Sequence, residues 1–299
     1  MSPARPEPVR PSDAVDCFVR ARPRLVGLAY RMLGVRADAE DVAQEAWLRW
    51  QAAEAGTIER PDAWLTTVTA RLALDRLKAL RRRREDYVGP WLPEPVVLAP
   101  GPEETAELAE TLTLGFLALL DRLGPVERAV LLLVDVFGVP YPDVAATVGK
   151  SEGACRQIAS RARRRVREGH PRSPSGPERR AVDALIAAVL AGDVDATLAS
   201  LTPDAVLVSD GGPDRYAARR PVAGADRVAR FLINLSHKQY RDARATPITV
   251  NGDPGLAVSV GGTLDMVVAF EVEDDRVAAV WVVRNPDKLA RVLSPATMS

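Results

Sequence analysis

Residues 141–166 read YPDVAATVGKSEGACRQIASRARRRV, and this stretch decides the fold class of the amino-terminal half. Its first part predicts a short helix that is broken at Gly149, because glycine can take the left-handed conformation that a tight turn needs. Ser151 is placed to cap the helix that follows. Apolar residues recur every four positions on that second helix and predict a buried stripe of Ala154, Ile158, Ala162 and Val166. Two helices joined by such a turn predict a helix-turn-helix.

The free face of the second predicted helix is basic. Between residues 156 and 167 there are six arginines and no acid. Arginine and glutamine carry paired hydrogen-bonding groups that match guanine and adenine edges in the major groove. The residues predicted to contact DNA here are Ser151, Glu152, Arg156, Gln157, Ser160, Arg161, Arg163, Arg164 and Arg167. The alternative is a solvated, charged helix in an ordinary bundle.

The formal net charge of zero, from 40 basic and 40 acidic residues, conceals two charge runs outside this helix. Residues 78–84 contain five basic residues and no acid, whereas residues 38–45 contain four acids and no base. Separate basic and acidic surfaces imply two partners, namely a polyanion and a positively charged protein surface.

The chain of 299 residues is long enough for two or three domains. We expect an all-α module at 1–88, a proline-rich linker at 89–102, a second all-α module at 103–169, a short linker at 170–177 and a last domain at 178–299. Short helices and strand-like runs with turn residues at their ends make the last domain α+β, with a curved, largely antiparallel sheet.

Several protein classes are disfavoured by the composition. No apolar run approaches the length of a membrane span, and the first residues lack a signal-peptide core, so we expect a cytoplasmic protein without membrane contact. Cys17 and Cys155 have no metal-ligand spacing and are expected to be reduced thiols. We expect no metal, no cofactor and a monomer.

Three stretches in order carry a family resemblance: DAEDVAQEAWLRW (38–50), PDAWLTTVTARLALDRLKALRRRRE (61–85) and the segment from Leu123 to Val166. They resemble bacterial sigma factors of the extracytoplasmic-function group, the first two looking like region 2 and the third like region 4. WLPEP (91–95), DGG (210–212) and NPDKL (285–289) resemble the subgroup with a fused SnoaL-like carboxy-terminal domain. This resemblance implies a region 2 helical bundle, a region 4 helix-turn-helix and an α+β cone.

The resemblance also implies partners and residues. A sigma factor binds core RNA polymerase and promoter DNA, and the positions that match the polymerase-binding helix are Asp41, Gln44, Glu45 and Arg49. The helix after it would open the minus-ten element and hold the DNA backbone in a basic groove. The residues expected to form that groove are Arg71, Arg76, Lys78, Arg81, Arg82, Arg83 and Arg84. The spacing of Trp47, Trp50 and Trp64 favours the helical core instead.

The linker has an unusual composition, because WLPEP is stiff and apolar where flexible linkers are small and polar. We hypothesise that it docks on the last domain near DGG and NPDKL and so controls the spacing of the two helical modules. The docking residues would be Trp91, Leu92, Pro93, Glu94, Pro95, Asp210, Gly211, Gly212, Asn285, Pro286, Asp287 and Lys288, with Asp287 and Lys288 exposed for binding. The alternative is a stiff spacer that docks nowhere.

A second hypothesis makes the last domain a small-molecule enzyme or a ligand sensor. An Asp general base in an apolar pocket would serve isomerase, cyclase or hydrolase chemistry, and the residues available are Asp210, Tyr216, His237 and Asp265. Because fold alone does not license an activity, we expect no enzyme, and a small molecule in the pocket stays open.

Overall fold

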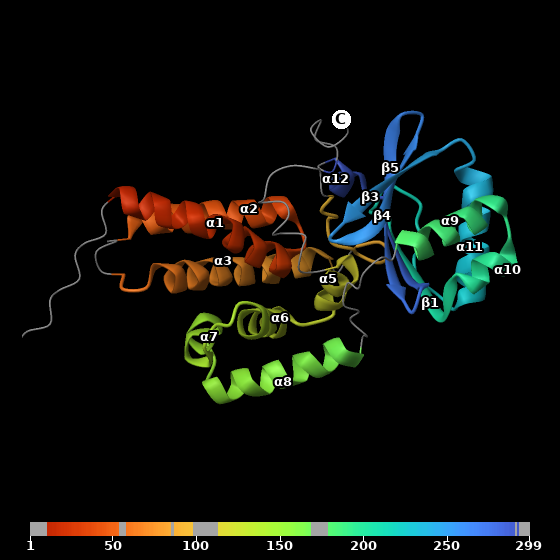
Figure 1. The fold of residues 1–299 in the computed structure, drawn as a ribbon. Coiled ribbons are helices and arrows are strands. Elements are labelled where there is room, and N and C mark those ends of the chain that lie inside the picture. Colours follow the sequence, from red (N-terminus) through yellow and green to blue (C-terminus); the bar gives the residue numbers. More distant parts are fainter. Residues whose placement is uncertain are drawn as a thin grey trace, which may run out of the picture. The chain divides into compact units, whose positions relative to one another are not determined.

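The computed structural model describes residues 11–53, 58–84, 87–97, 113–168, 179–290 and 292. The chain forms two compact units (Figure 1). The first unit takes in residues 1–85 and 120–169, and the second takes in residues 86–119 and 170–299. The second unit therefore includes the linker segment, defined here as Tyr87–Val97, together with the sheet domain.

The amino-terminal part of the first unit is a bundle of α1 (Pro11–Leu33), α2 (Arg36–Ala52) and α3 (Pro61–Arg84). Its core confirms the expected placing of the tryptophans. Trp50 is buried, with its ring centroid 5.4 Å from that of Trp64, and Trp47 packs against Phe18. These rings stabilise the bundle that presents the outer faces of α2 and α3.

The rest of the first unit confirms the helix-turn-helix. The order is α5 (Leu114–Asp121), whose last turn enters this unit, then α6 (Pro125–Leu131), the π-helical η2 (Leu132–Val136), α7 (Tyr141–Val148) and α8 (Glu152–Glu168). Gly149 ends α7 with φ of 68°, and the Oγ of Ser151 accepts a hydrogen bond from the amide of Ala154 at 3.2 Å. The predicted stripe is buried at Ile158, Ala162 and Val166, but Ala154 is only half-buried, because Cys155 faces the core instead.

The second unit is α+β, as expected. Besides the residues of α5 up to Leu119, its helices are α9 (Arg179–Ala191), α10 (Val194–Ala199), α11 (Ala225–Gln239) and α12 (Pro286–Leu289). Its strands are β1 (Leu201–Asp210), β2 (Val222–Ala223), β3 (Arg244–Val250), β4 (Asp253–Val260), β5 (Thr263–Glu273) and β6 (Arg276–Val283). The strand order is β2-β1-β6-β5-β4-β3, and every neighbouring pair is antiparallel except β1 with β6.

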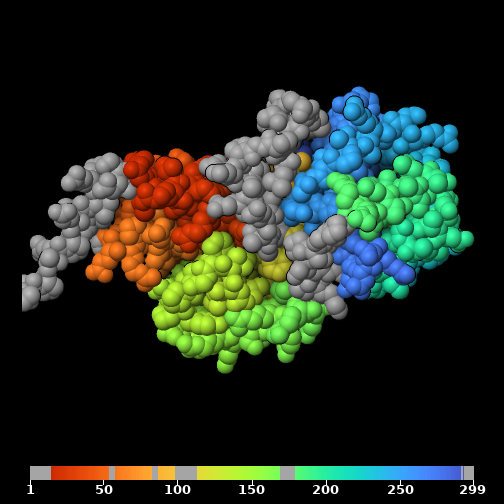
Figure 2. All heavy atoms as spheres, viewed as in Figure 1, coloured from red at the N-terminus to blue at the C-terminus, as the bar shows by residue number. Residues whose placement is uncertain are grey.

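The two faces of this sheet carry different partners. Helices α9, α10 and α11 lie together on one face (Figure 1), and their atoms pack against the strands (Figure 2). Because side chains alternate along a strand, Val280 and Val282 of β6 belong to the cluster under these helices, whereas Trp281 and Val283 belong to the opposite cluster. That opposite cluster also contains Leu92 of the linker segment. The sheet thus separates a helix-covered interior from a linker-covered face.

Candidate functional site

The linker segment is held at a buried carboxylate. Asp210, at the end of β1, is fully buried. Its Oδ1 accepts hydrogen bonds from the Tyr87 hydroxyl at 2.5 Å and the Gly212 amide at 3.0 Å. Its Oδ2 accepts from the Leu92 amide at 2.8 Å and from Lys288 Nζ at 2.5 Å. Four donors and an opposite charge compensate the loss of water around this carboxylate.

Lys288 provides the positive charge of the site. Its Nζ also donates to the Leu92 carbonyl and lies 4.1 Å from the ring centroid of Trp91 and 5.5 Å from that of Tyr87. The expectation that Lys288 is exposed is wrong, because the residue is only 7% exposed. Lysine is almost never fully buried unless it is paired, and the Asp210 carboxylate is its partner here.

Asn285 joins the NPDKL segment to the DGG loop. Its Oδ1 accepts from the Asp287 amide at 3.0 Å, which starts α12, and its Nδ2 donates to the Tyr87 hydroxyl at 2.9 Å. Gly212 has φ of 64°, and a Cβ there would lie 2.8 Å from Asn285 Cγ. A side chain at this position would therefore be strained and would displace the amide.

Apolar and backbone contacts continue along the linker segment. Leu92 is buried in a cluster with Leu114 and Trp281, and removing a leucine side chain from water contributes roughly 1.5–3 kcal/mol. The Val96 amide donates to Asn251 Oδ1 at 3.0 Å, and the Asn251 amide donates back to the Val96 carbonyl at 2.8 Å. Side chain and main chain are thus both fixed on the sheet.

The structure brings most of the expected docking residues together. Leu92 to Pro95, Gly211 and Gly212 are buried, Trp91 is half-buried, and Pro286 and Asp287 lie exposed at the rim. Sequence reasoning missed Tyr87 and Asn251. Tyr87 binds Asp210, 123 residues away, and Asn251 binds Val96, 155 residues away. Contacts between such distant residues cannot be predicted from local spacing.

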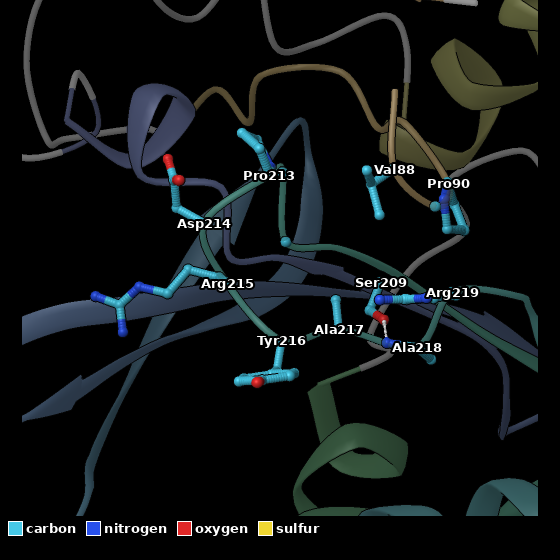
Figure 3. A pocket seen from close by; sticks show the side chains of 13 residues that line it. Val88, Pro90, Ser209, Pro213, Asp214, Arg215, Tyr216, Ala217, Ala218 and Arg219 are labelled. Atoms are coloured by element: carbon cyan, nitrogen blue, oxygen red, sulfur yellow. Dashed lines mark hydrogen bonds between the residues drawn. The ribbon is translucent and has the colours of Figure 1, made fainter. Parts of the chain in front are cut away.

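A hollow of about 310 Å³ lies beside the docked segment (Figure 3). Val88 and Pro90 line one side of it, and the loop from Gly211 to Arg219 lines the other. The Ala218 amide donates to Ser209 Oγ at 2.8 Å and fixes the end of that loop to β1. The segment before Trp91 therefore also borders the DGG loop.

The residues available for an enzyme do not form a catalytic group. Tyr216 is 93% exposed, and His237 lies in the last turn of α11 rather than after it. Asp265 accepts from Arg215 at 3.2 Å through Oδ1, and through Oδ2 from Tyr240 at 2.5 Å and Arg284 at 3.0 Å. Burial, and then the hydrogen bond to Asp265, raise the pKa of Tyr240. In the part of the chain that the structure describes, no hydrogen bond joins Asp210, Tyr216, His237 and Asp265 to one another.

Helix α8 presents most of the predicted DNA-contacting residues to solvent. Those exposed are Ser151, Arg156, Gln157, Ser160, Arg161, Arg164 and Arg167, and Glu152 is half-buried. Arg156 pairs with Glu152 at 2.9 Å. Arg163 instead makes two bonds, of 2.8 and 2.5 Å, to Asp135 of η2, and these bonds raise the pKa of Arg163. In this geometry Arg163 ties α8 to η2, and Arg165 likewise binds Glu127 at 2.8 Å, whereas Arg164 makes only a 3.8 Å pair with Glu168 on the surface of its own helix.

The basic residues of α3 divide in the same way. Arg71 donates to the Ala146 carbonyl at 2.9 Å, and Arg81 donates to the Leu123 carbonyl at 2.8 Å. Arg76 binds Asp38, which raises the pKa of Arg76. Lys78 pairs with Asp75 on the surface, and Arg82 is exposed. The side chains of Arg83 and Arg84 lie outside the described residues.

The outer face of α2 combines charge with one apolar side chain. Asp41, Gln44 and Arg49 are exposed, and Glu45 pairs with Arg49 at 3.0 Å. Leu48, beside them, is 51% exposed. Polar groups around an exposed leucine are suited to a protein partner.

Among the described residues, no cluster of His, Cys, Asp or Glu suits a metal ion, and no helix is both long and apolar enough to cross a membrane. Cys17 and Cys155 are free thiols, and burial raises the pKa of each.

Comparisons with known proteins match this arrangement. Family models described as "Sigma-70 region 2" and "Sigma-70, region 4" match residues 17–83 and 114–166. The "ECF RNA polymerase sigma factor SigJ" of Mycobacterium tuberculosis is 39% identical, with 92% of each chain covered. The "Probable ECF RNA polymerase sigma factor SigI" of the same organism is 34% identical, with 93% of this chain and 95% of that protein covered. The crystal structure of SigJ superimposes with a TM-score of 0.77 at 36% identity, over 92% of this chain and 98% of that one.

Proposed function

The chain belongs to the extracytoplasmic-function group of bacterial RNA polymerase sigma factors, which act in transcription initiation, and we propose how its parts divide that work. Helix α2 binds core polymerase, α3 and α8 bind the two promoter elements, and the second unit controls the linker segment. The proposed control of the linker segment rests above all on the Asp210–Lys288 pair, because both side chains bind the main chain of Leu92.

Polymerase binding is assigned to the outer face of α2. Asp41, Gln44 and Arg49 stand exposed around Leu48, so the face offers an apolar contact within a charged rim. An acidic run there suits a basic surface on the enzyme. Exposed charges of this kind fix the orientation of a complex and speed its formation more than they stabilise it.

Control of the linker segment follows from chain connectivity. The first unit's α3 ends at Arg84, and α5 begins at Leu114. How far the helices on either side can separate depends on how much of the intervening chain is docked. A shift in docking would change the fraction of molecules able to span both promoter elements by population shift.

We also propose that the second unit is not an enzyme. Both oxygens of Asp265 are engaged by Tyr240 and two arginines, and those of Asp210 are engaged by the linker segment and Lys288. A general base needs an accessible oxygen within hydrogen-bond reach of its substrate. Asp210 is fully buried, and Asp265 is held by two arginines and a tyrosine, so both are poorly suited to that role.

Run-off transcription with core polymerase and a pool of genomic promoters tests the assignment. The full chain is expected to start transcripts downstream of a shared pair of sequence elements. Asp41→Lys should abolish those transcripts because it reverses an exposed charge on the polymerase-binding face, and it should leave the melting temperature unchanged. Chains ending at Gly169 and Asn285 report what the second unit contributes. If none of the three chains starts transcripts, the first unit is only a DNA-binding module.

Arg156→Ala tests base reading by α8. The substitution is expected to weaken binding to the preferred upstream element by about 1–3 kcal/mol and to affect random DNA less. Fluorescence anisotropy on both duplexes measures the difference, and Arg219→Ala, an exposed arginine of the second unit, serves as the control. An equal loss on both duplexes would make Arg156 a phosphate contact instead.

A further inference from the structure

A cavity of about 140 Å³ lies under the helices of the second unit, on the sheet face away from the linker segment. It is open on one side and is bordered by α9, α11 and residues of β3, β4, β5 and β6. The side chains that shape it include Leu185, Leu232, Leu256, Met266, Phe270 and Val280. None of the docking contacts described above uses it.

The chemistry of the lining is almost uniform. Among the described residues around the cavity, only Ser236 and Tyr240 carry a polar side-chain atom. The Tyr240 hydroxyl is already bound to Asp265 at 2.5 Å, so the tyrosine contributes its ring. A charged or strongly polar molecule would lose its bonds to water there and find few replacements.

An apolar hollow of this size needs a reason. Protein interiors are close-packed, and apolar side chains left without neighbouring atoms lose dispersion contacts that would stabilise the fold. Water fills such a space poorly because it needs two to four polar partners. Leu190 is 62% exposed beside the opening, where Ala245 of β3 is exposed too. An apolar entrance leads to an apolar interior.

We propose that this cavity is a binding site for a small uncharged hydrocarbon-like molecule, about the size of one six-membered ring. An engineered cavity of about 150 Å³ with similar side chains in another protein binds benzene, which sets the size. The site is separate from the proposed polymerase, promoter and linker contacts, so this proposal can be tested independently of them. The molecule is bound by dispersion and the hydrophobic effect, without chemical change.

Methionine NMR on the full chain tests the proposal. The sequence has four methionines; Met266 lines the cavity, whereas Met32 is buried in the first unit. With ¹³Cε-labelled methionine, toluene is expected to shift the Met266 signal saturably through its ring current and to leave Met32 in place. Benzoate, which has the same ring and a charge, is expected to bind at least about tenfold more weakly.

A matched pair of variants locates the binding. Ala245→Phe fills the entrance from an exposed position, so the fold tolerates it, and it should weaken toluene binding at least about tenfold. Val260→Phe adds a ring at an exposed strand position outside the cavity and should leave binding unchanged. The proposal is overturned if Met266 does not respond, if benzoate binds as well as toluene, or if both variants behave like the unaltered chain.

Discussion

Replacing Lys288 by alanine is expected to lower the free energy of unfolding of the second unit by about 3–5 kcal/mol. The substitution leaves the Asp210 carboxylate buried with its charge uncompensated. It also removes the donor to the Leu92 carbonyl and the cation beside Trp91. Because these losses fall on the linker segment, hydrogen exchange at the Leu92 amide should rise by at least about a hundredfold. Exchange measured by mass spectrometry and urea unfolding check both effects.

Two further variants separate the pair from general effects. Lys238→Ala removes an exposed lysine of α11 and should change stability by less than about 0.5 kcal/mol. Asp210→Asn combined with Lys288→Met removes both charges and should be less destabilised than Lys288→Ala, because no isolated buried charge remains. If Leu92 exchange in Lys288→Ala matches that in Lys238→Ala, the pair does not hold the linker segment.

The helix-turn-helix could be predicted because its determinants are local. The turn at Gly149, the cap at Ser151 and the stripe from Ile158 to Val166 lie within one short stretch. The single error, Ala154 for Cys155, is one position at the first turn of a helix, where periodicity has the fewest residues to average over. Arg163 shows the limit of this reasoning, because a helical wheel contains no information on Asp135, 28 residues away.

The sequence could indicate which segments form the docking site but not which atoms bond to one another there. The composition of WLPEP singled out one half, and family resemblance pointed to the other. The atoms that join them are separated by 118 to 198 residues, and contacts at that distance leave no periodic pattern. A turn at Asn285-Pro286 predicts an exposed Lys288, and only the fold reveals that Asp210 lies opposite it. The parallel pairing of β1 with β6 is non-local in the same way.

Binding to promoter DNA is expected to depend steeply on salt although the chain has no net charge. A protein that neutralises six to ten phosphates loses about 10³–10⁵ in affinity between about 50 and 200 mM salt. The exposed arginines of α8, together with Lys78 and Arg82 of α3, would supply contacts of that number. Anisotropy titrations over this salt range give the slope of log K against log salt.

Changing Arg161, Arg164 and Arg167 to glutamine assigns that slope to α8. These side chains are exposed, and each lost phosphate contact reduces the slope by about 0.9, so the triple variant should lose about 2.7. Changing Arg219, Arg220 and Arg227 to glutamine alters the net charge equally at exposed positions of the second unit and should leave the slope in place. Equal slopes for the two triple variants would mean that average charge governs binding. A loss confined to the first would mean that phosphates lie along α8, since counterions are released only where arginines meet the backbone.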